Sequence, residues 1–558
     1  MDEKDIERGL DTQQQPQYPT EKAEESPIDA SEGGGEGFGP IRTAAAAPTT
    51  PRPLSRASRN SRGSLSRERS NNGYGCDDLA EDSDNTNPSD SSAQQQEKDP
   101  FEVGWEGGDN DPMCPRSMPT WRKWVIIGIT SFGSFCVTNA SSIYTTTYAQ
   151  MDAEFHNSRI IATLGLSTFV LGIALGPFWS PLAEFYGRRP IYLAAFAAYL
   201  IWIIPSAVSQ NIQTMIVARF FQGLAGSAFL SVSGGTVGDL FDRKTMQAPM
   251  AIFTLAPFIG PSTGPLIGGF INYNVYWRWT HYFLIIWSFV LFVSIAVLVP
   301  ETYHPVLLKA KAQRIRAETG DGRYKAPMEK STKSIPKTVA WSLLRPFQLL
   351  IFEPMCLVLD IYAAVLLGIL YLFFGAFPLV FINNHGFNLW QVGLTFLGLF
   401  CAMVIAVLST PIWHHIRDYL PERRQRLYGG ELKSEPEDQL PSVIFGAPLI
   451  TGGLFWFGFT TYPNIHWIVP IIGSGVFGLG TVDAYPLYAA SALAGNAFVR
   501  CTFAAAFPLF GIQMYEKLGY QWATGLLAFL TLAMLPFPYL FFRYGKKLRA
   551  RSRFATAS

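Results

Sequence analysis

Two aspartates lie where charged residues are rare in this chain. Asp360 is in the sequence VLDIY and Asp483 in TVDAY, each several residues inside a long apolar run. Because burial disfavours the charged form of a carboxyl group, an aspartate in such a place can take up a proton at accessible pH. This pattern predicts that Asp360 and Asp483 bind and release protons. The alternative is a structural carboxylate bonded to a neighbouring hydroxyl or to Arg500.

A cation lies in another apolar run. Arg219 begins the sequence RFFQG. An arginine inside a membrane-spanning helix costs from about 2.5 kcal/mol upward, so its side chain is expected to face the protein interior and to find partners there. The alternative is that the guanidinium extends to the membrane interface.

Residues 260–269 read GPSTGPLIGG, within a stretch from 248 to 271 that carries no charge. In a helix interior Gly costs roughly 1 kcal/mol and Pro about 3. In a membrane, small residues let two helices approach closely, and Pro permits a bend. We therefore expect a bent helix, closely packed against a neighbour.

These residues must be positioned by membrane-spanning helices. The chain has 558 residues, of which 48% are apolar and only 16% charged, whereas a soluble chain averages about 25% charged. Apolar runs of about 20 residues, long enough to cross a bilayer core of about 30 Å, alternate with short polar breaks. The expected spans are 124–148, 160–183, 191–209, 213–234, 247–272, 281–300, 350–382, 391–414, 442–461, 466–490, 497–515 and 520–542.

Lys and Arg gather on alternate breaks, as the positive-inside rule requires. One side of the membrane receives basic residues at 188–189, 243–244, 309–345, 417–433, 500 and 543–553. The other receives only Arg159, Arg278 and Lys517. The asymmetry predicts that both termini and the central loop are cytoplasmic.

The spans fall into two groups of six. We expect an all-α membrane protein with a disordered cytoplasmic tail (1–118), a six-helix half (119–300), a central cytoplasmic loop (301–348), a second six-helix half (349–543) and a basic tail (544–558). The first 118 residues are rich in Ser, Gly, Pro, Gln and Asp, a composition that cannot bury enough surface to fold. Two parallel repeats of this kind place a substrate site between the halves, near the middle of the membrane.

A charged turn follows the second span. The sequence SPLAEFYGRRP, residues 180–190, puts a carboxylate, a turn-forming glycine and two arginines at a helix end, a group that can break and re-form as helices move. Here the chain resembles the major facilitator superfamily, whose signature is Gly-x-Leu-x-Asp-Arg-x-Gly-Arg-Arg/Lys. The predicted gate residues are Leu182, Glu184, Gly187, Arg188 and Arg189. The chain departs from the signature at Ser180, Glu184 and Phe185, and Phe185 removes one charged partner.

The resemblance extends over about residues 120–545 and is most specific in the first six spans. RFFQG is similar to the RxxQG motif, which implies that Arg219 couples proton movement to conformational change. The run at 260–269 is similar to GxxxGPxxGG, a pattern that this superfamily associates with antiporters. Its fixed positions are Gly260, Gly264, Pro265, Gly268 and Gly269. PETY at 300–303 and WRW at 277–279 resemble the fungal twelve-span drug:proton antiporters, although residues 144–148 read YTTTY where many relatives carry a proline.

Aromatic and amphipathic side chains are the candidates for contact with substrate. Aromatic faces attract cations and stack on flat apolar molecules, which suits an amphipathic or cationic small molecule. Aromatic residues are also common on surfaces that face lipid, which is the alternative for each of them. The predicted substrate-binding residues are Asn139, Tyr144, Gln222, Tyr362, Tyr371, Phe374 and Tyr485.

The resemblance implies a proton-coupled exporter of drugs, toxins, secondary metabolites or polyamines at the plasma membrane. The alternatives are an importer of a small nutrient or siderophore on the same fold, and a non-transporting membrane sensor. No HExxH, P-loop or Gly-x-Ser-x-Gly sequence occurs, so we expect neither an enzyme nor an ATP-driven pump. A net charge of +1 gives no support to nucleic-acid binding. The six scattered cysteines suggest no disulfide framework or metal site. We expect no cofactor, and a monomer.

Overall fold

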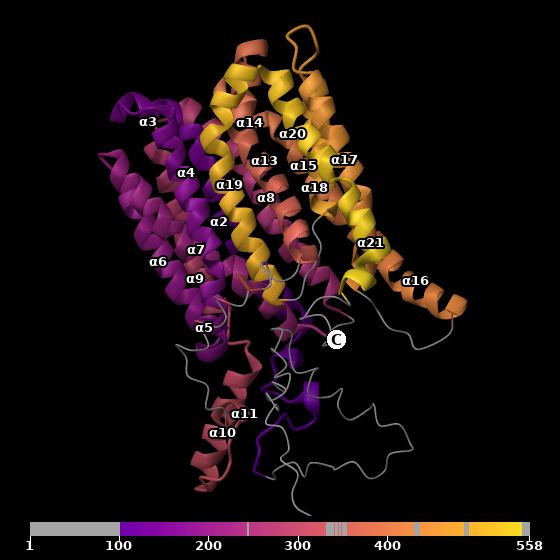
Figure 1. Cartoon of the computed structure of the whole chain (residues 1–558). Helices are drawn as coiled ribbons and strands as arrows, with labels where there is room; N and C mark the ends of the chain where they lie inside the picture. Colours follow the sequence, from indigo (N-terminus) through magenta and orange to yellow (C-terminus); the bar gives the residue numbers. More distant parts are fainter. Residues whose placement is uncertain are drawn as a thin grey trace, which may run out of the picture. The chain divides into compact units, whose positions relative to one another are not determined.

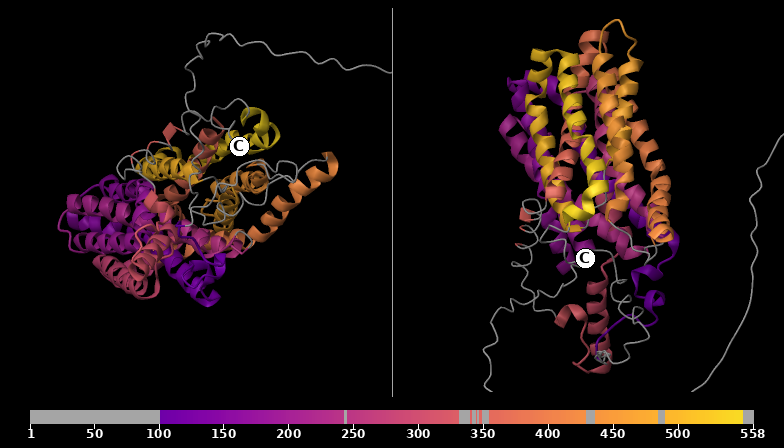
Figure 2. Two further views of the ribbon diagram at one scale, coloured as in Figure 1. Left: turned by 90° about the horizontal axis from the view of Figure 1, so that it is seen from below. Right: turned by 45° about the vertical axis from the view of Figure 1, so that its right-hand side comes forward.

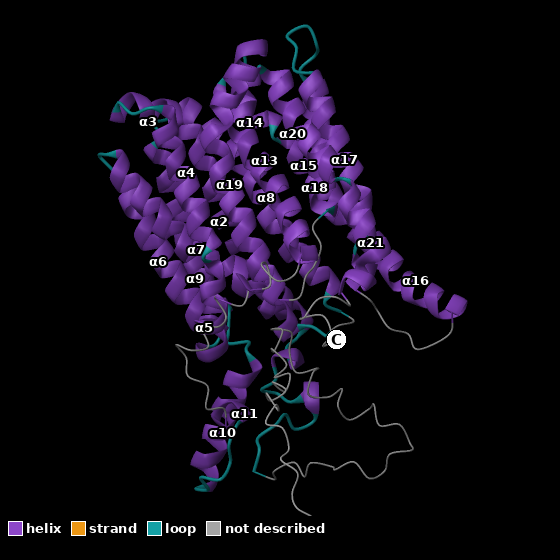
Figure 3. Cartoon of the chain, in the orientation of Figure 1, coloured by secondary structure: helices purple, strands orange, loops and turns teal. Residues whose placement is uncertain are grey.

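Helices account for nearly all of the ordered chain (Figure 3). The computed structural model describes residues 101–242, 245–330, 354–428, 436–484 and 490–549, with a few positions between 340 and 348. Within these ranges the β-structure is one isolated bridge between Glu102 and Lys325. The expected all-α class is confirmed.

The first half of the bundle runs from α2 to α9. Its elements are α2 (Thr120–Ile143), the 3₁₀ turn η3 (Tyr144–Thr147), α3 (Tyr148–Phe155), α4 (Arg159–Ala174), α5 (Trp179–Tyr186), α6 (Arg188–Ala207), α7 (Ile212–Leu240), α8 (Gln247–Asn274) and α9 (Arg278–Leu298). Several boundaries have local causes. Asn211 caps α7 by accepting the N–H of Thr214 at 2.8 Å, and Gly187, with φ +97°, separates α5 from α6.

The second half runs from α13 to α21. Its elements are α13 (Pro354–His385), α14 (Leu389–Thr395), α15 (Leu397–Leu408), α16 (Thr410–Tyr428), α17 (Pro441–Phe459), α18 (Ile468–Asp483), α19 (Ala490–Leu518), α20 (Tyr520–Met534) and α21 (Pro536–Arg549). In the described chain, eleven helical segments are long and apolar enough to cross a membrane, and α18 is a shorter apolar helix. Together they account for the twelve expected spans.

Between the halves, α10 (His304–Thr319) and α11 (Pro327–Lys330) lie beyond one end of the bundle (Figure 1). We call this the lower end and the opposite one the upper end. The views in Figure 2 show helices of the two halves side by side, with α10 outside the bundle. The α4 and α8 helices of the first half pack against α19, α14 and α15 of the second.

Two regions differ from the expected organisation. The segment 101–118, expected in the disordered tail, is ordered. It lies against α10 through the Asp111–Lys311 ion pair, and Val103 donates its N–H to Lys325 O after that helix at 3.0 Å. The central segment, expected as a loop, contains the sixteen-residue helix α10. Few apolar residues hold these parts together, which is why composition alone indicated disorder.

Candidate functional site

One face of the Gly-Pro run of α8 lies directly against α2. A Cβ atom added at Gly264 would collide with Ser142 Oγ and would lie 2.6 Å from the backbone nitrogen of Ile143. One turn away in each direction, a Cβ atom on Gly260 would collide with the hydroxyl of Thr138, and one on Gly268 with that of Thr146. The expected close helix contact is therefore present, and the neighbour is the first span.

The other face of this run meets the second half. A Cβ atom on Gly269 would lie 2.9 Å from Leu389 O, and one on Gly393 would lie 2.6 Å from Pro265 O. Leu389 and Gly393 belong to α14. We call the contact among Pro265, Gly269, Leu389 and Gly393 the upper seal. One short sequence thus packs closely against α2 of the first half and against α14 of the second half.

Arg219 is fully buried in the first half. Its Nη1 donates to Ala140 O at 3.0 Å and its Nη2 to Ser141 O at 3.3 Å. The guanidinium carbon lies 4.4 Å from the ring centre of Tyr144 and 4.3 Å from that of Phe169. No carboxylate among the described residues forms an ion pair with it, so carbonyl oxygens and aromatic faces stabilise the charge.

Three of the predicted substrate-binding residues lie in the buried region around Arg219 and form hydrogen bonds there. Tyr144 donates its hydroxyl to Ala162 O at 3.1 Å and lies beneath Arg219. Gln222 accepts from Arg219 Nη1 at 3.3 Å. Asn139 donates to Thr263 Oγ1 of α8 at 2.9 Å. All three are fully buried, and none of them lines the two cavities described below.

Tyr371 connects this region to the second half. Its hydroxyl lies 2.9 Å from Ser141 Oγ, and the Ser141 carbonyl accepts from Arg219. Tyr371 and Phe374, whose rings meet edge to face at 5.2 Å, also line a cavity between the halves. Its described lining residues are Thr145, Tyr148, Thr163, Leu166, Tyr371, Phe374, Gly375, Pro508 and Ile512. These residues offer hydroxyl groups and aromatic rings but no carboxylate.

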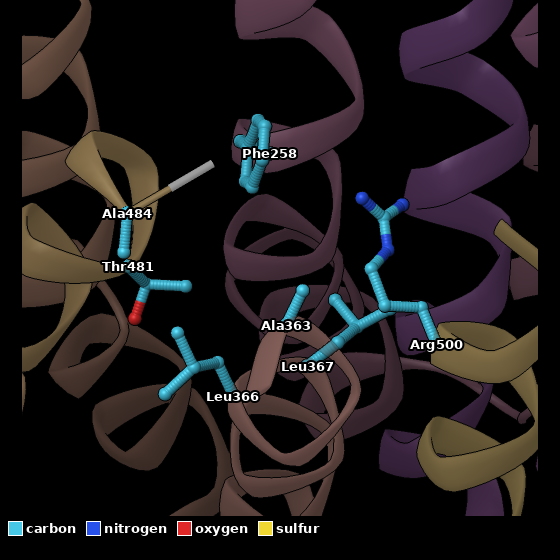
Figure 4. A pocket seen from close by; sticks show the side chains of 7 residues that line it. All are labelled: Phe258, Ala363, Leu366, Leu367, Thr481, Ala484 and Arg500. Atoms are coloured by element: carbon cyan, nitrogen blue, oxygen red, sulfur yellow. The ribbon is translucent and has the colours of Figure 1, made fainter. Parts of the chain in front are cut away.

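A second cavity lies nearer the lower end, where α8 approaches the second half (Figure 4). Phe258 of α8 faces it from one side, and the guanidinium of Arg500 from another. Among the described residues, the lining consists of Phe258, Ala363, Leu366, Leu367, Thr481, Ala484 and Arg500. Residues of both halves therefore surround this space.

Asp360 lies one turn before Ala363 on α13 and is 3% exposed. Asn496 and Arg500 of α19 are its polar neighbours. The carboxyl group is thus buried one turn from a lining residue of the lower cavity, and Arg500, which also lines the cavity, is an electrostatic partner. Tyr362 is 2% exposed and does not line either cavity. Tyr485 lies outside the described residues.

Asp483 ends α18 and has a different environment. Its Oδ1 accepts from Trp413 Nε1 at 3.2 Å and from Ser409 Oγ at 3.5 Å. Both donors belong to the second half, and Asp483 itself is 6% exposed. Its neighbours Thr481 and Ala484 line the lower cavity, but the carboxyl group is held by neutral donors.

The predicted gate residues meet the end of α7. Arg188 is 2% exposed, and its Nε lies 3.1 Å from Asp239 Oδ2. The Arg188 guanidinium also lies over the ring of Tyr303, 4.7 Å from its centre. Leu182 is half-buried against the core, and Glu184 is also half-buried. The central ion pair thus joins α6 to α7.

Glu301 of the PETY sequence holds the start of α6. Its carboxylate accepts the N–H groups of Arg188 at 2.8 Å and Arg189 at 3.1 Å, in addition to those of residues 302 and 303. Arg189 is exposed and donates to Ala296 O at 2.8 Å. A Cβ atom on Gly187 would collide with Glu301. Gly187 is therefore required both by its positive φ and by this carboxylate.

Sequence reasoning missed Asp239 and left Glu301 without a role. Asp239 lies next to the last residue of α7 and looked like an ordinary polar residue at a membrane interface. One signal in the sequence could have indicated Asp239. No acidic residue lies between Arg219 and Asp239 on the same helix. Glu301 was noticed only as part of a short pattern.

Replacing Glu301 with glutamine is expected to destabilise the lower end. The uncharged amide brings its own N–H donors toward four backbone N–H groups, and hydrogen bonds to charged groups contribute about 1.5–3 kcal/mol. We expect the Tm of the purified protein to fall by about 1 °C per kcal/mol lost, since the shift decreases as the folded chain becomes longer. The matched control is Glu318→Gln, because Glu318 is an exposed partner of Arg314. Equal Tm values for the two variants would contradict the capping role.

No group of three or more His, Cys, Asp or Glu residues in the described part of the chain could hold a metal ion. The five cysteines in that part are free thiols.

Comparisons with known proteins agree with this arrangement. The profile of the Major Facilitator Superfamily matches residues 130–499. The efflux pump atB of Aspergillus terreus is 52% identical over 81% of this chain and 89% of its own length. The probable drug/proton antiporter YHK8 of Saccharomyces cerevisiae is 40% identical over 79% of this chain and 87% of its own. The multidrug transporter mdrA of Aspergillus fumigatus is 39% identical over 83% and 77%.

Two solved structures share the fold. The human organic anion transporter MFSD10 superposes with a TM-score of 0.51 at 14% identity, over 75% of this chain and all of that one. A partially occluded, inward-open form of the xylose transporter XylE from E. coli gives a TM-score of 0.50 at 14% identity, over 76% and 98%.

Proposed function

The chain belongs to the major facilitator superfamily, and we propose that it is a proton-coupled antiporter that exports small molecules. It is a multi-pass membrane protein and not an enzyme. The observation that carries the proposal is the carboxyl group of Asp360, buried beside a cavity to which both halves contribute. Burial favours protonation of the carboxyl group, and a position close to the substrate path allows the binding of the proton and of the substrate to affect each other.

The upper seal and the lower cavity indicate how transport proceeds. The seal closes the upper end between the halves, whereas the lower cavity lies where α8 faces α13, α18 and α19. Substrate enters this space from the lower side, which we assign to the cytoplasm. Movement of one half against the other then opens the seal. Arg188, Asp239 and Glu301 act as the cytoplasmic gate, and Arg219 couples the first half to Tyr371 of the second.

The substrate is a flat, amphipathic molecule with hydrogen-bonding oxygens. The described linings of both cavities offer aromatic rings, threonine hydroxyls and Arg500 but no carboxylate. A polyamine needs carboxylates as partners, and Asp360, the buried carboxyl group beside the lower cavity, is assigned to the proton. The importer and sensor alternatives are not favoured, because the relatives are named efflux pumps and antiporters. We place the protein in the plasma membrane, as a monomer with both termini in the cytoplasm.

The test is transport by purified protein in liposomes loaded with a panel of aromatic acids, neutral aromatics, cationic dyes and spermidine. We expect movement of the uncharged or acidic aromatics against their gradient when a proton gradient is imposed, and loss of this movement with an uncoupler. Accumulation that an uncoupler leaves unchanged would show facilitated transport instead. Transport of spermidine alone would reverse the substrate assignment.

A further inference from the structure

Residues 101–118, here called the strap, lie against α10 and the turn that follows it. The N–H of Val103 donates to Lys325 O and the N–H of Lys325 to Phe101 O, each at 3.0 Å. Val103 is buried with three residues of the central segment, namely Leu308, Ala312 and Ala326. The strap and α10 therefore share a small apolar core that is separate from the bundle.

A buried ion pair fastens the strap to α10. Lys311 Nζ lies 2.7 Å from Asp111 Oδ2, and these residues are 8% and 4% exposed. Asp111 also accepts the N–H groups of Glu106 at 3.1 Å and Met113 at 2.9 Å. Lys311 donates to Gly104 O at 3.2 Å and lies 3.3 Å from the Glu106 carboxylate. Every charge in this contact has a partner within the strap or α10.

The strap unit also reaches both sides of the Arg188–Asp239 pair. Arg116 of the strap, with its side chain 3% exposed, pairs with Asp242 at 3.2 Å, just beyond the end of α7. On the other side, His304 Nε2 of α10 lies 2.9 Å from the Asp239 carbonyl oxygen. The residue before it, Tyr303, supplies the ring beneath Arg188. The last turn of α7 is thus held between the strap and α10.

We propose that the strap is a positioning element of the cytoplasmic gate. Asp111 and Lys311 fix α10, and α10 together with Arg116 fixes the end of α7 that carries Asp239. The inference rests on the gate role proposed above for Arg188 and Asp239. A helix end frays unless it is tied down, so loss of the strap lets Asp239 move away from Arg188 and changes the rate at which the gate opens and closes.

The strap is expected to stay attached across the pH range of transport. Burial by itself would raise the pKa of Asp111, but the hydrogen bonds from Lys311, Met113 and Glu106 hold it below its usual range. Because the pKa of Asp111 is lower in the folded protein, its carboxylate stabilises the fold fully above the ordinary pKa of about 3.9. This stabilisation is lost as the pH falls through the pKa of the folded state. The charged groups that face Asp111 are Lys311 and Glu106. Between pH 5 and 8 the Asp111–Lys311 ion pair is therefore expected to stay intact.

The test combines hydrogen exchange with transport for the full-length protein in nanodiscs and liposomes. Lys311→Met leaves the buried Asp111 carboxylate without its cation, and Asp111→Asn leaves Lys311 with only the exposed Glu106 carboxylate as an ion-pair partner. We expect each to raise amide exchange in residues 236–242 by about fivefold or more and to lower turnover by about threefold, with KM within twofold. The double variant removes both charges and should recover at least half of each loss, because removing both partners costs less than removing one. Lys309→Met, an exposed position on the same helix, is the matched control.

Two outcomes would overturn the proposal. In one, exchange rises only in residues 101–118 and 304–319 while residues 236–242 and turnover keep wild-type values. In the other, Arg116→Gln, which keeps the strap core, leaves amide exchange at residues 236–242 unchanged. If Lys311→Met does not fold, Arg116→Gln is the variant that tests the positioning role. If wild-type protein shows no proton-driven export but the exchange results are as expected, the proposed function fails while the positioning of α7 stands.

Discussion

Replacing Asp360 with asparagine is expected to reduce proton-driven export by about tenfold or more. Asparagine keeps the size of the side chain and its place beside Asn496 and Arg500, but it cannot take up a proton. Substrate exchange without a proton gradient should stay within about twofold of wild type, since it needs only the cavity and the movement of the halves. The measurement is initial export rate against external pH, which should become flat in the variant.

Two controls make this result specific. Asp418→Asn removes an exposed carboxylate of α16 and should leave the pH profile unchanged. Asp483→Asn removes the other carboxylate predicted to carry the proton, which neutral donors already satisfy. A flat profile in Asp483→Asn together with a normal one in Asp360→Asn would transfer the coupling role to Asp483. A normal profile in both variants would exclude both sites.

Replacing Gly264 with alanine is expected to abolish transport. The added Cβ would collide with Ser142 Oγ, which could rotate away, but also with the backbone nitrogen of Ile143 at 2.6 Å, which cannot move without shifting α2. Overpacking of this kind costs about 1–3 kcal/mol, and a backbone obstacle puts Gly264 at the upper end of that range. We expect a clear fall in Tm and at least about a tenfold loss of export, because Arg219 depends on carbonyls of the same stretch of α2.

Gly452→Ala is the matched control, since Gly452 also lies inside a membrane helix but has no atom within 4 Å of an added Cβ. In a helix interior this change is neutral or stabilising by up to about 1 kcal/mol. Ser142→Ala should not rescue Gly264→Ala, because the Ile143 nitrogen remains in the way. Wild-type transport by Gly264→Ala would show that the two helices can separate at no cost.

Some parts of this structure could be predicted from the sequence because the lipid environment alone requires them. A 20-residue apolar run needs a helix in lipid, and a glycine row in such a helix needs a close neighbour. Which helix packs against the glycine row depends on contacts between residues that are far apart in the sequence. Nothing near Gly264 indicates that α2 lies against it, or that Gly269 faces α14.

Other features become visible only in three dimensions. Tyr144 and Gln222 are predicted to contact substrate, and the structure places both against the buried guanidinium of Arg219, which requires partners. The strap was missed because its stability comes from one ion pair and a few apolar side chains, too few to change the composition of 101–118. Asp239 became recognisable only once Arg188 was found beside it.

The upper seal is made of backbone atoms: the carbonyls of Pro265 and Leu389 against the α-carbons of the opposing glycines. The cavities, by contrast, are made of side chains. Side-chain substitutions in the cavities can therefore change the substrate specificity without changing the upper seal. Such a division allows the substrates of a transporter to diversify over evolution at little risk of leakage. It also offers a route for redesign, in which Phe374 is varied and the glycines are kept.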